Sequence, residues 1–157
     1  MPSSSNPSLN ADEENFDLSR FVVAQAKDYA YALAELRAGK KQTHWIWYVL
    51  PQLRGLGSSS RANFYGIGSV REARDYLAHP ILGPRLRECV AAMNALETRS
   101  AVEVLGPVDA AKFRSCLTLF GFVAPDEAIF SDALEKYFAG IPDEKTIDLL
   151  KLIRRDT

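Results

Sequence analysis

Apolar residues recur along most of the chain at spacings of three, four and seven, which puts them on one side of an α-helix. From about position 17 onward, only short stretches rich in glycine, proline or serine interrupt this pattern. No pair of alternating apolar runs flanks a hairpin dipeptide, and no repeat period is visible. The pattern predicts an all-α fold of about six to eight helices. A short strand pair around residues 45–50 is the alternative that stays open.

Several helix ends are marked by capping residues and helix breakers. The expected N-terminal caps, two of them in capping boxes with a later glutamate, are Asp17, Ser69 with Glu72, Ser100 with Glu103, and Asp109. Gly39 is expected to end the first helix in a left-handed conformation. Residues 61–67 are expected to form one more short helix. The segment 110–124 is apolar on several sides, so we expect it to be the central helix.

The chain divides into a tail and one domain. Residues 1–15 are rich in Ser, Asn and Pro and end in acidic residues, which predicts a disordered tail. Residues 16–157 have the length and composition of a single globular domain, with no second composition shift.

Charge and hydropathy exclude some classes of protein. Lys and Arg total 19 against 20 for Asp and Glu, which gives a net charge of -1 and argues against a nucleic-acid binder that works through bulk charge. No apolar run approaches the ~20 residues of a membrane span, and the first residues do not read as a signal peptide. A cytoplasmic location is therefore expected, with no membrane partner.

The two cysteines, Cys89 and Cys116, lie within apolar helical runs. This position predicts buried, reduced thiols, as is usual in the cytosol. Because there is no CxxC motif and no Cys/His cluster, the sequence predicts neither a metal site nor a cofactor.

The stretch KKQTHWIWYVLPQLRGLG, residues 40–57, carries the main candidate chemistry. His44 is a candidate catalytic residue because imidazole exchanges protons near neutral pH, although a lone histidine is more often a structural or surface residue. Trp45 and Trp47 offer flat faces beside two lysines, and Gln52 can both donate and accept hydrogen bonds. The stretch is therefore either an aromatic core segment or the wall of a pocket for a planar anion.

Two basic clusters elsewhere are further candidates, in the segments HPILGPRLR and KFRS. The complete set of expected ligand-binding residues is His44, Trp45, Trp47, Gln52, Tyr65, Arg85, Lys112 and Arg114. The basic members can equally well be held in ion pairs, for which Asp109 and Glu88 are available.

Five segments in order resemble a known family: FDLSRFVVAQ, GKKQTHWIWYVLPQLRGLGSSS, YLAHPILGPRLREC, DAAKFRSCLTLF and DEKTIDLL. They are similar to the domain of unknown function 1810 family of bacterial and fungal proteins, over residues 16–150. The resemblance implies a mostly helical single domain and no particular activity. The family usually has Ser-Met-Thr-Leu-Phe where this chain has residues 115–120, SCLTLF. RFVVAQ is also similar to a motif of proteins that process ADP-ribose-type nucleotides.

Two functional hypotheses follow, and the sequence does not decide whether the protein is an enzyme. The first is a site for a small planar anion, nucleotide or ADP-ribose-like, built by residues 44–52 and the basic helices. The second is a non-enzymatic module that uses the aromatic segment to bind a protein partner, since interfaces also favour Trp, Tyr and Arg. A third reading makes the segment only core. A pocket on which His44, Tyr65 and an arginine converge would favour the first. The oligomeric state is not indicated.

Overall fold

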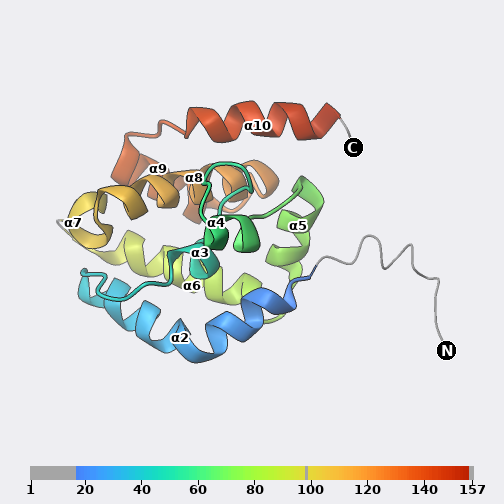
Figure 1. Ribbon diagram of the computed structural model, residues 1–157. Coiled ribbons are helices and arrows are strands. Elements are labelled where there is room, and N and C mark those ends of the chain that lie inside the picture. Colours follow the sequence, from blue (N-terminus) through green and yellow to red (C-terminus); the bar gives the residue numbers. More distant parts are fainter. Residues whose placement is uncertain (1–16, 98, 156–157) are drawn as a thin grey trace.

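The computed structural model describes residues 17–97 and 99–155, and this part of the chain is built from nine helices (Figure 1). Within it there is no strand, and the one β-bridge, between Leu53 and Ile67, is isolated. The predicted all-α class is confirmed. The predicted tail, residues 1–15, lies outside the described residues.

The helices are α2 (Ser19–Ala38), α3 (Ile46–Val49), α4 (Ser60–Tyr65), α5 (Val70–Ala78), α6 (Leu82–Ala95), α7 (Ala101–Leu105), α8 (Pro107–Val123), α9 (Ala128–Phe138) and α10 (Glu144–Arg155). Within residues 45–50 the chain forms the short α3 rather than strands, which brings the number of helices in the described chain above eight. As expected from Pro51, α3 ends before Leu50.

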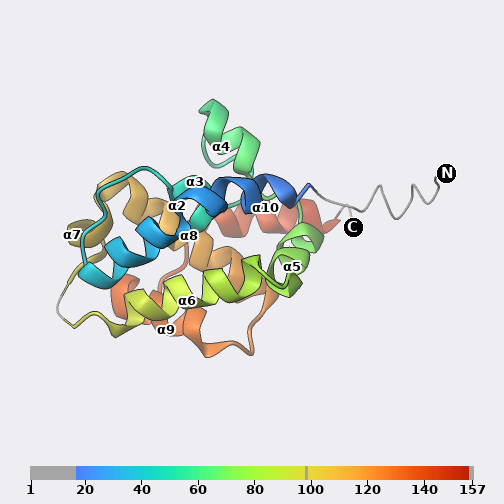
Figure 2. The same ribbon diagram turned by 90° about the horizontal axis from the view of Figure 1, so that it is seen from below.

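Helix α8 is the centre of the fold. It contacts α5, α7, α9 and α10, while α2 and α6 pack side by side below it (Figure 1). Phe113, Leu117 and Phe120 on α8 are completely buried, as its apolar pattern predicts. Helix α4 projects from the body, as the perpendicular view shows (Figure 2). In the described part of the chain no helix is both long and apolar enough to span a membrane.

Two of the predicted helix ends and one predicted short helix are confirmed. Gly39 has φ +76° and ends α2, and Ser100 and Glu103 form a complete capping box before α7. Helix α4 covers most of the short helix expected over residues 61–67.

The other capping predictions are wrong in whole or in part. Asp17 does not cap α2, whose N-cap is Leu18; its carboxylate instead accepts a hydrogen bond from the Ser19 hydroxyl. Helix α8 begins at Pro107, because proline is well suited to a first turn, so Asp109 lies inside the helix. Ser69 does accept from the Glu72 amide, but the Glu72 carboxylate turns elsewhere.

That carboxylate forms a buried ion pair with Arg20, at 2.9 Å between Nη1 and Oε2. Only 6% of the Arg20 side chain and 4% of the Glu72 side chain are exposed. Arg20 also donates to the carbonyls of Phe64 and Gly66, and Glu72 accepts from the Gly68 amide at 2.7 Å. The pair therefore joins α2, α5 and the segment between α4 and α5. Such extra hydrogen bonds are what a buried charge pair requires.

We expect Glu72→Ala to destabilise the protein by about 3–5 kcal/mol, because it leaves the Arg20 charge buried without its partner. The matched control is Arg37→Ala, which breaks the Arg37–Glu88 pair, whose side chains are 62% and 45% exposed. That change should cost at most about 1 kcal/mol. Free energies of unfolding from urea titrations compare the two, and equal losses would contradict the assigned role of the buried pair.

The two cysteines are free and buried, as predicted. Burial raises the pKa of the Cys89 thiol to about 12 and raises the pKa of the Cys116 thiol well above its ordinary value. Both thiols therefore stay protonated across the physiological pH range.

We expect both thiols to react with Ellman's reagent much more slowly in the native protein than after unfolding in guanidinium. The thiolate is the reacting species, and at about pH 8 a buried thiol with a raised pKa supplies almost none. The absorbance of the released dye measures both rates. Rapid release of two equivalents from the native protein would contradict the burial of these side chains.

Candidate functional site

The loop before α3 is fixed by one carboxylate, that of Glu35 on α2. It accepts hydrogen bonds from the amides of Gln42 and Thr43, at 2.8 and 3.0 Å, and from the Trp45 indole at 2.9 Å. Burial by itself would raise the pKa of Glu35, but these hydrogen bonds, together with one from the Thr43 hydroxyl, outweigh it and lower the pKa. Trp45 is completely buried. It belongs to the core, so the expectation that it binds a ligand is not supported.

Trp47 lies on a different side from Trp45: it belongs to α3, whereas Trp45 is the N-cap residue that precedes the helix. The Trp47 ring is half-buried and carries the Arg61 guanidinium at 4.9 Å from the ring centroid. The opening stretch therefore divides between the two readings of it. Trp45 is core, and Trp47 faces outward beside a hollow.

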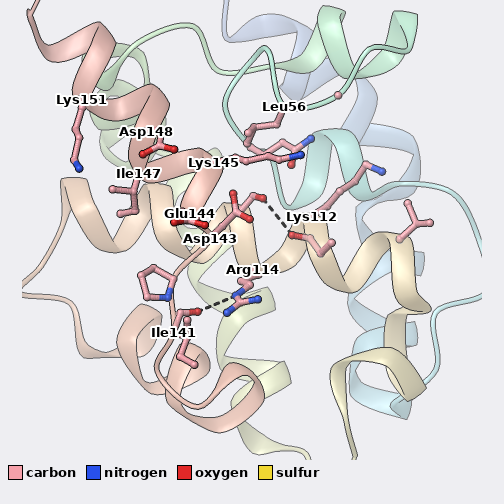
Figure 3. Close-up of a pocket in the computed structure, with 16 residues that line it drawn as sticks. Leu56, Lys112, Arg114, Ile141, Asp143, Glu144, Lys145, Ile147, Asp148 and Lys151 are labelled. Atoms are coloured by element: carbon pink, nitrogen blue, oxygen red, sulfur yellow. Dashed lines mark hydrogen bonds between the residues drawn. The ribbon is translucent and has the colours of Figure 1, made fainter.

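A broad groove of about 970 Å³ lies next to this stretch, between the segment 52–57, helix α8 and the start of α10 (Figure 3). Gln52 lines it from the first segment, and Lys112, Arg114 and Ser115 line it from α8. The second wall, formed by residues 141–151 at the start of α10, adds the charged residues Asp143, Glu144, Lys145, Asp148 and Lys151. The groove thus carries four cationic and three acidic side chains, with Lys145 extending toward Leu56 (Figure 3).

A much smaller hollow, of about 10 Å³, adjoins the groove. Trp47 and Tyr65 line it, and it shares Gln52 and Lys112 with the groove. Four of the predicted residues therefore meet at this end of the groove, and Arg114 lies further along it.

His44 and Arg85 do not join them, so the expected convergence of these two residues on the cleft is not found. His44 is exposed and lines neither hollow; its carbonyl accepts a hydrogen bond from the Tyr48 hydroxyl. Arg85 lies against Tyr29, 4.7 Å from the ring centroid, and points to the buried amide of Gln25. Arg85 lies apart because α6, which carries it, packs against α2 and away from the α8–α10 groove.

The cations of the groove are only partly neutralised. Asp109 lies 4.0 Å from Lys112 but pairs more closely, at 2.9 Å, with Lys41. The proposed ion pair between Lys112 and Asp109 thus exists in a weak form. Lys145 and Lys151 form no ion pair with any other residue that the structure describes.

Asp143, one of the three acidic residues of the α10 wall, has a structural role. Asp143 accepts hydrogen bonds from the amide and hydroxyl of Thr146, at 2.9 and 2.6 Å, and so caps α10. Its own amide donates to the Thr118 hydroxyl at 2.8 Å, which fixes the start of α10 on α8. Sequence reasoning missed this wall. The Pro-Asp start of the helix was visible, but which helix it would face was not.

The described chain is a small all-α domain with a polar, open groove beside its central helix. It belongs to the family described as "Protein of unknown function (DUF1810)", which it matches over residues 15–150. The family resemblance of the sequence is confirmed.

One solved structure is similar to the chain in sequence and fold. The chain is similar to the conserved hypothetical protein Rv1873 from Mycobacterium tuberculosis, with 49% sequence identity and a TM-score of 0.86. The similarity covers 87% of this chain and 98% of the mycobacterial one. No protein of curated function matches the chain.

The two tryptophans should respond differently to truncation. Trp45→Ala removes a fully buried ring and one of the hydrogen bonds that Glu35 accepts, so we expect a loss of about 3–5 kcal/mol in the free energy of unfolding. Trp47→Ala should cost clearly less because its ring is half-exposed. Chemical denaturation followed by circular dichroism compares the variants. A larger loss for Trp47→Ala would contradict the assignment of Trp45 to the core.

Proposed function

We propose that the groove binds a small anionic ligand, with Gln52 and Lys112 in contact with it. The single observation that carries the proposal is the gathering of weakly paired cations from α8 and α10 in one concave site. Lys112 is half-buried there, and the carboxylate nearest to it is already paired with Lys41. An anion would supply the missing charge, while Gln52 would add a neutral donor and acceptor.

The aromatic residues support a planar ligand less directly. The hollow between Trp47 and Tyr65 has room for about one water molecule. A base or other ring would have to stack at the mouth of this hollow, or move the side chains that line it. Nucleotides and ADP-ribose-like compounds combine an anionic group with a ring, so they are the first ligands to test. The anionic group is the better supported part of this proposal.

One observation favours the alternative, a non-enzymatic module that binds a protein segment. Val108 and Ile141 line the groove although the two residues are 66% and 57% exposed. Exposed apolar residues at the edges of a groove suit a partner with matching apolar groups. This partner would occupy the same groove, so the two functions differ in the ligand and not in the place.

We propose no catalytic role for His44, since it lies outside the groove. A cytoplasmic location is part of the proposal and is supported by the two reduced thiols. The net charge of -1 argues against nucleic acid as the ligand.

A thermal-shift screen with ADP, ADP-ribose and citrate tests the proposal. A ligand at ~100 times its Kd should add about 2.7 kcal/mol to stability. We expect Lys112→Ala and Gln52→Ala to reduce that shift, because each removes a contact with the ligand. Lys27→Ala is the matched control: it removes one exposed lysine from α2, outside the groove, and should leave the shift unchanged.

Two outcomes would count against the groove as the site. One is a ligand whose thermal shift survives both Lys112→Ala and Gln52→Ala. The other is a shift that Lys27→Ala reduces as much as Lys112→Ala does, since this would indicate a general effect of net charge.

A further inference from the structure

The guanidinium group of Arg114 is held in place from one side only. Its Nε donates to the carbonyl of Ile141 at 2.8 Å, and its Cζ lies 5.4 Å from the centroid of the Phe138 ring. The Phe138 ring also packs against Phe113 of the core, which limits its own movement. Arg114 is therefore fixed in orientation by the protein itself, as Figure 3 shows for the bond to Ile141.

These contacts leave the other edge of the guanidinium group available. Neither Nη1 nor Nη2 donates to a residue in the part of the chain that the structure describes, and no described carboxylate lies within 4.0 Å of them. The Nη1–Nη2 edge carries parallel N–H groups, which match the two oxygens of a carboxylate or phosphate. Arg114 lines the groove, so a ligand there can reach this edge.

The other cations that line the groove are lysines, which offer no pair of parallel donors, and two of its other polar groups are already used by the protein. The Ser115 hydroxyl donates to the Ala111 carbonyl at 3.2 Å, and the Asp143 carboxylate caps α10. Lys112 and Lys145 carry charge on flexible stems, so they attract an anion without fixing its orientation.

We infer that Arg114 determines which anion the groove accepts. Its two Nη groups bind a group with two oxygens, a carboxylate or a phosphate, through a pair of parallel hydrogen bonds, while Lys112 adds attraction. The inference rests on the proposed function of the groove and goes beyond it in naming the anionic group and the residue that selects it.

NMR titrations of ¹⁵N-labelled protein with inorganic phosphate, succinate and chloride, at matched ionic strength, test this. We expect saturable shifts of the Arg114 side-chain nitrogens with phosphate, succinate or both, and not with chloride, which has a single centre. The comparison of phosphate with succinate shows which of the two anionic groups is preferred.

Arg114→Lys keeps the charge and removes the parallel donors, so the Kd should rise by at least about tenfold. Lys112→Arg, which keeps a cation where orientation is not required, should bind within about threefold of the wild type. Arg114→Lys also removes the bond to Ile141, so Phe138→Leu serves as the structural control: it loosens the support but keeps the donors. We expect it to weaken binding less than Arg114→Lys does.

The outcomes separate this inference from the proposed function. If Arg114→Lys binds phosphate and succinate as the wild type does while Lys112→Ala loses them, the groove is the site and Arg114 is not its selector. If both variants bind normally, or if neither anion gives saturable shifts in the wild type, both ideas are overturned. Should Arg114→Lys fail to fold, the wild-type Nη resonances decide: no movement at saturation overturns the role of Arg114.

Discussion

The buried ion pair between Arg20 and Glu72 joins three parts of the chain that are far apart in the sequence. Through it, the segment after α4 is held against α2 and α5. The same segment continues into Ile67, whose amide donates to the Gln52 carbonyl at 2.9 Å. The pair thus lies two steps from the groove. Through this segment the pair positions the backbone of Gln52, and so one side of the small hollow that Gln52 and Tyr65 line, although it contacts neither of these two side chains.

How far the sequence could predict the molecule depended on the range of the interaction. The helices were predictable because their apolar spacing is local, and so was the Gly39 end, where a left-handed residue is needed. The predicted cap at Asp17 is wrong because its carboxylate accepts a hydrogen bond from the nearby Ser19 hydroxyl instead. Glu72 shows the difference most clearly. The capping-box pattern predicts that its carboxylate bonds to Ser69 nearby, whereas in the structure it pairs with Arg20, which is distant in the sequence.

The same distinction explains the candidate site. Trp47, Gln52 and Lys112 were found as chemistry-bearing residues, but so were His44 and Arg85, which lie elsewhere. Residue type identifies what a side chain can do, and only helix packing decides which side chains meet. The α10 wall was missed for this reason. Its charged residues read as an ordinary solvent-facing helix surface, and they become part of a groove because α10 packs against α8, with its start held by the Thr118 hydroxyl.

The two walls of the groove differ in how firmly they are built. Helix α8 belongs to the core, whereas α10 lies along one outer side of the fold (Figure 1) and fully buries only Thr146 and Leu150 among its described side chains. Such a helix opens locally at a lower free energy than the core does. A ligand that contacts both walls would stabilise α10 against this local opening. Hydrogen exchange of the α10 amides would therefore slow when the groove is occupied, and α10 would report on ligand binding.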